Sequence, residues 1–140
     1  MSAPDYTDLS LSALTWNEAE QISCAELTGA HGEKLYLDLD SLDAAELVRL
    51  IDHPQTEQGR VHSVLIELLI ANKYTSEAVF LSFGDDARVH CRLLFQKKSS
   101  PGFLELRPGD GLVVSQLLRI PVYAHRALLA FVDSPSTTVG

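Results

Sequence analysis

The stretch AVFLSFGDDARVHCRLLF, residues 78–95, decides the fold class that we expect. Its first six residues favour a strand, and Gly84-Asp-Asp86 then signals a turn. From Arg88 to Phe95 apolar and polar side chains alternate, which is typical of a strand with one buried and one solvated face. The stretch therefore predicts an antiparallel β-hairpin.

The residues before this hairpin predict further strands and two helices. Alternating apolar residues predict short strands at 9–13, 22–27 and 35–39, and a glycine-containing turn joins the last two. A helix is expected next, and it ends before Pro54, which cannot continue it. A second helix is expected at 61–73, where apolar residues recur at helical spacing.

The residues after the hairpin predict four more elements. Residues 103–106 favour a short strand, and a helix is expected at 108–119 because proline is favourable at the first helical position. A short strand at 122–124 and a helical turn at 126–131 complete the chain.

Together these elements predict one α+β domain of antiparallel hairpins with about three helices. The domain is expected to cover residues 9–132, between disordered ends at 1–8 and 133–140. Ile66 and Ile70 lie outside the apolar stripe of the second helix and need a cover of their own. A second subunit would supply it, so we expect a homo-oligomer.

Two strand-to-helix junctions resemble each other. Leu37-Asp-Leu-Asp-Ser-Leu-Asp43 leads into the first helix, and Leu104-Glu-Leu-Arg-Pro-Gly-Asp110 leads into another 67 residues later. Asp43 and Asp110 occupy equivalent places in the first turns, where the helix dipole favours an anion. We treat an internal βα duplication as a hypothesis.

Composition and charge limit the classes of function. The 140 residues are 46% hydrophobic, as in folded globular proteins, and the net charge of −8 argues against broad coating of nucleic acid. Residues 71–140, however, carry eight basic against six acidic side chains, which leaves room for a local basic site. No apolar run is long enough for a membrane span and no signal peptide is evident, so we expect a cytoplasmic protein.

The two cysteines, Cys24 and Cys91, are far apart in sequence and form no metal-ligand spacing. They are expected to be small core residues in a reducing compartment, although a disulfide between them stays an open alternative.

Three short motifs occur in the second half in a fixed order. They are Arg60-Val-His-Ser-Val-Leu65, Glu105-Leu-Arg-Pro-Gly-Asp110 and Arg119-Ile-Pro-Val-Tyr123. Their order and spacing resemble the bifunctional nuclease domain, a small α+β family whose members typically carry Thr-His-Asp-Leu, Arg-Pro-Ser-Asp and Pro-Ile-Tyr-Val there. The resemblance covers roughly residues 9–132. Ser63 and Gly109 depart from it, because the family usually has Asp and Ser at these places.

The resemblance implies a nuclease-like phosphodiester hydrolase acting on DNA or RNA, with a divalent cation such as Mg²⁺. His62 is the candidate general base, since the ordinary pKa of histidine lies near neutrality. Asp110 is the second candidate catalytic residue and, with Asp43, the candidate metal ligand. Arg107, at a helix N-terminus, is a candidate phosphate-binding residue. The competing interpretation is structural, with Asp110 complementing the helix dipole and pairing with Arg107.

Arg88 and Arg92 are further candidate phosphate-binding residues, because they share one strand face with His90 and such a set of side chains could bind a phosphate backbone. The simpler interpretation is a solvated hairpin face. A rival function fits the same sequence: a non-catalytic oligomeric module that binds a small anionic ligand or a protein partner. It accounts equally well for Ser63, which leaves no acid beside His62, and for the negative net charge.

Overall fold

The computed structural model describes residues 5–17, 19, 22–52, 61–98 and 100–129. Within them it forms a mixed α+β fold around one seven-stranded sheet, with the strand order β3-β2-β1-β7-β4-β5-β6. The elements are β1 (Tyr6–Asn17), β2 (Ile22–Gly29), β3 (Lys34–Leu39), α1 (Ser41–Asp52), α2 (Val61–Ala71), β4 (Thr75–Phe83), β5 (Val89–Lys97), β6 (Ser100–Leu106), α3 (Pro108–Leu118) and β7 (Val122–His125). A helical turn at 126–129 follows β7.

The sheet consists of two antiparallel meanders, β1-β2-β3 and β4-β5-β6, which the short strand β7 joins. β7 pairs antiparallel with β1 and parallel with β4. The parallel pair closes the sheet through contacts that are remote in sequence.

The order of elements repeats along the chain. Three antiparallel strands and a helix, β1-β2-β3-α1, are followed after α2 by β4-β5-β6-α3. The resemblance that the sequence shows at the two strand-to-helix junctions is therefore part of a larger βββα repeat. Whether a gene duplication produced it stays a hypothesis.

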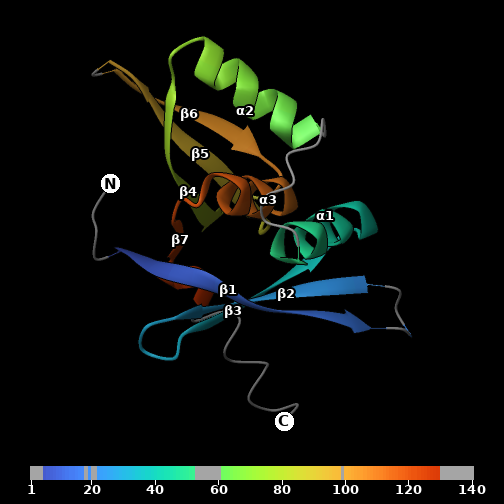
Figure 1. The fold of residues 1–140 in the computed structure, drawn as a ribbon. Coiled ribbons are helices and arrows are strands. Elements are labelled where there is room, and N and C mark those ends of the chain that lie inside the picture. Colours follow the sequence, from blue (N-terminus) through green and yellow to red (C-terminus); the bar gives the residue numbers. More distant parts are fainter. Residues whose placement is uncertain (1–4, 18, 20–21, 53–60, 99, 130–140) are drawn as a thin grey trace.

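The helices gather on one side of the strongly twisted sheet. Figure 1 shows α1 beside the β1–β3 part, α2 beside the β4–β6 part and α3 between them. The core lies between helices and sheet, where Val79, Leu81 and Leu93 are fully buried with Leu112 and Val113 of α3. Burial of such side chains contributes about 1.5–3 kcal/mol each to folding.

Local signals explain the bounds of α3. Pro108 stands at its start, and Arg119 ends it with a left-handed backbone (φ 55°) whose N–H donates to the carbonyl of Ser115. Inside the helix, a Cβ at Gly111 would overlap the sulfur of Cys91. The glycine thus lets α3 lie close on β5.

Several expected boundaries differ from the structure. β1 already includes Tyr6–Asp8, expected to precede the domain, because they pair with β7. β5 and β6 extend over most of the loop expected at 97–102, since Lys98 adopts a left-handed φ of 58° between them. α2 ends at Ala71, where the next turn tightens. Residues 133–140 lie outside the described part of the chain.

The argument for an oligomer changes with the packing of α2. Ile66, expected to need an external cover, is buried within the chain at 9% exposure. Ile70 remains 63% exposed and Leu68 57%. The homo-oligomer therefore stays a prediction that rests on the outer face of α2 alone. No helix within the described residues is both long and apolar enough to cross a membrane.

Candidate functional site

The two equivalent strand-to-helix junctions meet in space. Asp40 precedes α1 and Arg107 precedes α3, and α1 packs against α3 so that the two helix N-termini come together. Asp40 caps α1, since its Oδ1 accepts the N–H of Asp43 at 2.8 Å. The two meanders thus deliver residues from both halves of the chain to one place.

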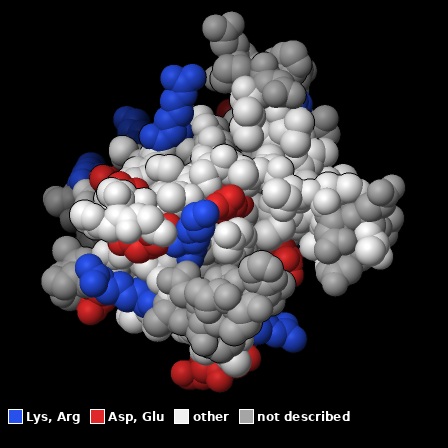
Figure 2. Space-filling view, turned by 90° about the horizontal axis from the view of Figure 1, so that it is seen from below, with Lys and Arg blue, Asp and Glu red and all other residues white. Residues whose placement is uncertain are grey.

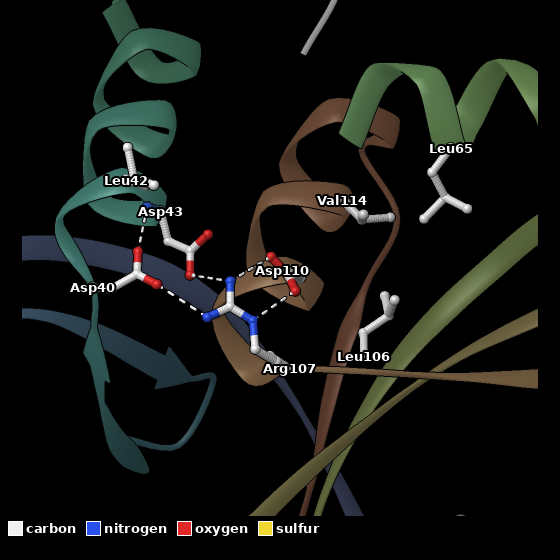
Figure 3. Close-up of a pocket in the computed structure, with 8 residues that line it drawn as sticks. All are labelled: Asp40, Leu42, Asp43, Leu65, Leu106, Arg107, Asp110 and Val114. Carbon is white, nitrogen blue, oxygen red and sulfur yellow. Dashed lines mark hydrogen bonds and ion pairs between the residues drawn. The ribbon is translucent and has the colours of Figure 1, made fainter. Parts of the chain in front are cut away.

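Arg107 lies at the centre of this place and binds three carboxylates. Its Nη1 donates to Asp40 Oδ2 at 3.0 Å, and its Nη2 donates to Asp43 Oδ2 at 3.3 Å. Nε and Nη2 donate to the two oxygens of Asp110, each at 3.0 Å, in a bidentate pair. Figure 3 shows the guanidinium between the three acids. Among the described side chains, one guanidinium thus faces three carboxyl groups.

Electrostatics within the cluster follow from these bonds. The N–H of Asp43, and then the Arg107 guanidinium, lower the pKa of Asp40 below its ordinary value. Asp110, followed by Asp40, raises the pKa of Arg107, which is charged in any case. Arg107 is 63% exposed while the Asp43 side chain is only 5% exposed. The guanidinium therefore neutralises a carboxylate that water barely reaches.

Gly109 allows Asp43 to take its place. A Cβ at this glycine would overlap Oδ2 of Asp43. The absence of a side chain at Gly109 therefore leaves the room that the Asp43 carboxylate occupies. Gly109, where the sequence departs from the resemblance, thus accommodates the buried carboxylate of Asp43.

A pocket of about 400 Å³ opens beside the cluster. Leu65, Leu106 and Val114 lie on one side of the three acids and form an apolar wall, and Leu42 stands at the rim with 80% exposure (Figure 3). The volume is within the range of small-molecule sites. The pocket therefore combines an ionic end with an apolar wall.

His62, the candidate general base, belongs to the first turn of α2, three residues before Leu65. Its side chain lies outside the described part. The structure thus brings Asp43, Arg107 and Asp110 together and places the helix that carries His62 beside them.

Arg88 and Arg92 do not join this site. Arg92 lies on the face of β5 opposite to the buried Cys91 and Leu93, and therefore away from the helices. Arg88 lies in the turn before β5. Phosphate binding was expected from Arg88, Arg92 and Arg107 together, but the first two lie apart from Arg107 and the pocket. Alternation along a strand shows that residues share a face, but it does not show which face carries the pocket.

His90, which was expected to share a strand face with Arg88 and Arg92, contacts two carboxylates. Its Nδ1 lies 3.0 Å from Glu105 Oε1 and its Nε2 lies 2.9 Å from Asp86 Oδ1. Glu105, and then Asp86, raise the pKa of His90. The bridge ties the β4–β5 turn to β6, and no signal in the sequence pointed to it.

The chemistry of the donors allows a divalent cation. Mg²⁺ prefers oxygen ligands and often takes one or two protein carboxylates, which Asp43 and Asp110 would provide. In the part of the chain that is described, however, no three His, Cys, Asp or Glu side chains form a ready-made metal group. The carboxylates surround Arg107 instead.

Charges elsewhere show no single trend. On the face in Figure 2, acidic and basic side chains are interspersed over a mainly uncharged surface, without a continuous basic patch.

Both cysteines are free thiols, and burial followed by the charge of Asp110 raises the pKa of Cys91 to about 12. The disulfide left open above is therefore not formed in this structure.

No protein-family model matches the chain, and no curated protein matches it either.

Proposed function

We propose that this protein is a nuclease-like phosphodiester hydrolase that acts on DNA or RNA. The observation that carries the proposal is the convergence of Asp43, Arg107 and Asp110 in one pocket. Two of these residues come from the Arg-Pro-Gly-Asp motif and one from the equivalent junction 67 residues earlier. The resemblance to the bifunctional nuclease domain supplies the substrate class.

The three carboxylates around Arg107 determine what the site needs in order to bind a phosphate. Three carboxylates would repel a phosphate more strongly than one guanidinium attracts it, so a cation must accompany it. Asp43 and Asp110 would hold Mg²⁺, which polarises a phosphoryl oxygen and lowers the pKa of water when bound. Arg107 would then exchange a carboxylate for a phosphate oxygen, which its planar fork can bind bidentately.

The remaining roles follow from position. His62, in the first turn of α2 beside the pocket, would move the proton. The apolar wall of Leu65, Leu106 and Val114 would exclude water from one side of the scissile group. Ser63 stands where the family has an acid, so His62 has to act without that adjacent carboxylate.

The test is cleavage of single-stranded DNA and RNA by the purified chain, with Mg²⁺ and with a chelator. We expect cleavage only with Mg²⁺, and a rate lower by about a hundredfold in Asp43→Asn. Asp38→Asn is the matched control, because Asp38 is an exposed carboxylate on the opposite face of the sheet. Equal rates in the two variants would contradict the proposal.

A second candidate function rests on a different observation. Each guanidinium nitrogen of Arg107 already donates to a carboxylate, and most of the pocket wall is apolar. This arrangement suits a non-catalytic oligomeric module that binds a protein partner, or a small anionic ligand that a cation accompanies. Stabilisation by nucleotides or phosphate in thermal unfolding, without turnover, would favour it. Light scattering after size exclusion tests the oligomeric state. A monomer at micromolar concentration would contradict the predicted homo-oligomer.

A further inference from the structure

The sheet face turned away from the helices carries a cluster of aromatic rings. Phe80 of β4 is its centre. It stacks on Tyr123 of β7 with ring centroids 5.3 Å apart and an interplanar angle of 22°. Tyr6 of β1 and Phe103 of β6 meet Phe80 edge-on, at 5.3 and 6.3 Å. We call these four residues the aromatic face.

Strand register explains why the rings share one side. Phe80 lies between Val79 and Leu81, both fully buried beneath the helices, so its own side chain points the other way. Tyr123 is the direct partner of Phe80 on β7. Phe103 is 48% exposed, while the other rings are partly exposed. No described helix covers them.

An arginine adjoins the rings. Arg92 of β5 is the direct cross-strand partner of Phe80, on the same side of the sheet. It is exposed, and among the described residues it makes no ion pair. Cations placed beside exposed rings are the feature that single-stranded nucleic acids bind, because bases stack on the rings and phosphates meet the cation.

Acidic neighbours limit the electrostatic part of such binding. In the row of partners that contains Phe80 and Arg92, Asp8 stands at the β1 end and Glu105 at the β6 end. A long phosphate backbone would be repelled at both ends. The face therefore suits a few unpaired bases with one or two phosphates, and not a duplex, whose base faces are hidden.

We propose that the aromatic face binds short single-stranded nucleic acid, with bases stacked on Phe103 and Tyr123 and a phosphate at Arg92. The face lies on the side of the sheet opposite to the pocket. The inference goes beyond the proposed hydrolase and does not depend on it, because the aromatic face is separate from the pocket. Binding is measured without cleavage, so either proposal can fail alone.

The experiment measures fluorescence anisotropy of labelled oligothymidylate and oligouridylate with a chelator present. We expect Phe103→Ala and Arg92→Gln each to weaken binding about tenfold. Log affinity should fall with log salt with a slope of about −1, as one or two phosphate contacts imply. Tyr36→Ala and Arg119→Gln are the controls, since they alter an exposed aromatic on β3 and an exposed arginine after α3.

Other results would overturn the inference. They are absence of binding at millimolar protein, duplex binding as tight as single-strand binding, or equal losses in the control variants. A concentration-dependent dimer that Phe103→Ala dissociates would assign the face to a second copy of the chain. Thermal unfolding verifies that each variant folds. Phe103→Trp should retain or tighten binding, which a merely structural role of Phe103 does not predict.

Discussion

Arg107 and Asp40 are 67 positions apart in sequence, yet Nη1 of the arginine lies 3.0 Å from Oδ2 of the aspartate. Each residue immediately precedes a helix in its own βββα unit. The contact therefore joins equivalent points of the two units. It makes Arg107 both a structural link between the halves and the centre of the candidate site.

Removal of the guanidinium should destabilise the fold. Arg107→Gln removes the guanidinium that donates to Asp43, whose side chain is only 5% exposed. We expect a loss of about 2–3 kcal/mol in the free energy of unfolding, since a buried carboxylate loses a charged hydrogen-bond donor. Urea denaturation measures it. In Asp43→Asn the same arginine change should cost clearly less, and equal costs in the two backgrounds would contradict the coupling.

Substitution of Gly109 should destabilise the fold. Gly109→Ala places a Cβ where Oδ2 of Asp43 lies, so we expect a loss of about 1–3 kcal/mol. Asp43→Ala removes the obstructing carboxylate and should restore most of this loss when the two changes are combined. Thermal unfolding of the three variants provides the comparison. A loss that is unchanged in the combined variant would place the clash elsewhere.

The His90 bridge should make stability depend on pH. Because its carboxylate partners raise its pKa above 6.5, the stabilisation is fully present below pH 6.5 and is lost as pH rises through the raised value. The difference in melting temperature between the wild type and His90→Gln should therefore shrink from pH 6 to pH 9. His31→Gln, in the β2–β3 turn, is the control. A difference that grows with pH would contradict the bridge.

The two thiols should differ in reactivity. Cys91 is fully buried with a pKa of about 12, whereas Cys24 is partly exposed, with a pKa raised first by burial. We expect Cys24 to react slowly with a thiol reagent at pH 8 and Cys91 to react only after unfolding. An intact mass two hydrogens short, or equal rates at both sites, would contradict free thiols of this kind.

Local patterns predicted much of the architecture. Alternation predicted the β4–β5 hairpin, and Pro108 predicted the start of α3. The place of β7 between β1 and β4 could not be predicted, because four residues carry too little pattern to specify partners so remote in sequence. The parallel pairing with β4 depends on tertiary packing alone.

The candidate site was predictable in part. The resemblance between the two strand-to-helix junctions, 67 residues apart, predicted that Asp43 and Asp110 are equivalent. The structure brings both to Arg107. That Asp40 joins them follows from the packing of α1 on α3, which no local pattern encodes. Alternation predicted that Arg88 and Arg92 share one side of a strand, and only the fold shows that Arg92 faces away from the pocket.

One measurement tests the central claim most directly: the initial rate of Mg²⁺-dependent cleavage of single-stranded RNA and DNA by the wild type and by the double variant His62→Ala, Asp110→Ala. The account predicts cleavage by the wild type and none above background for the folded double variant. Cleavage that survives both substitutions would contradict the assignment of catalysis to this pocket.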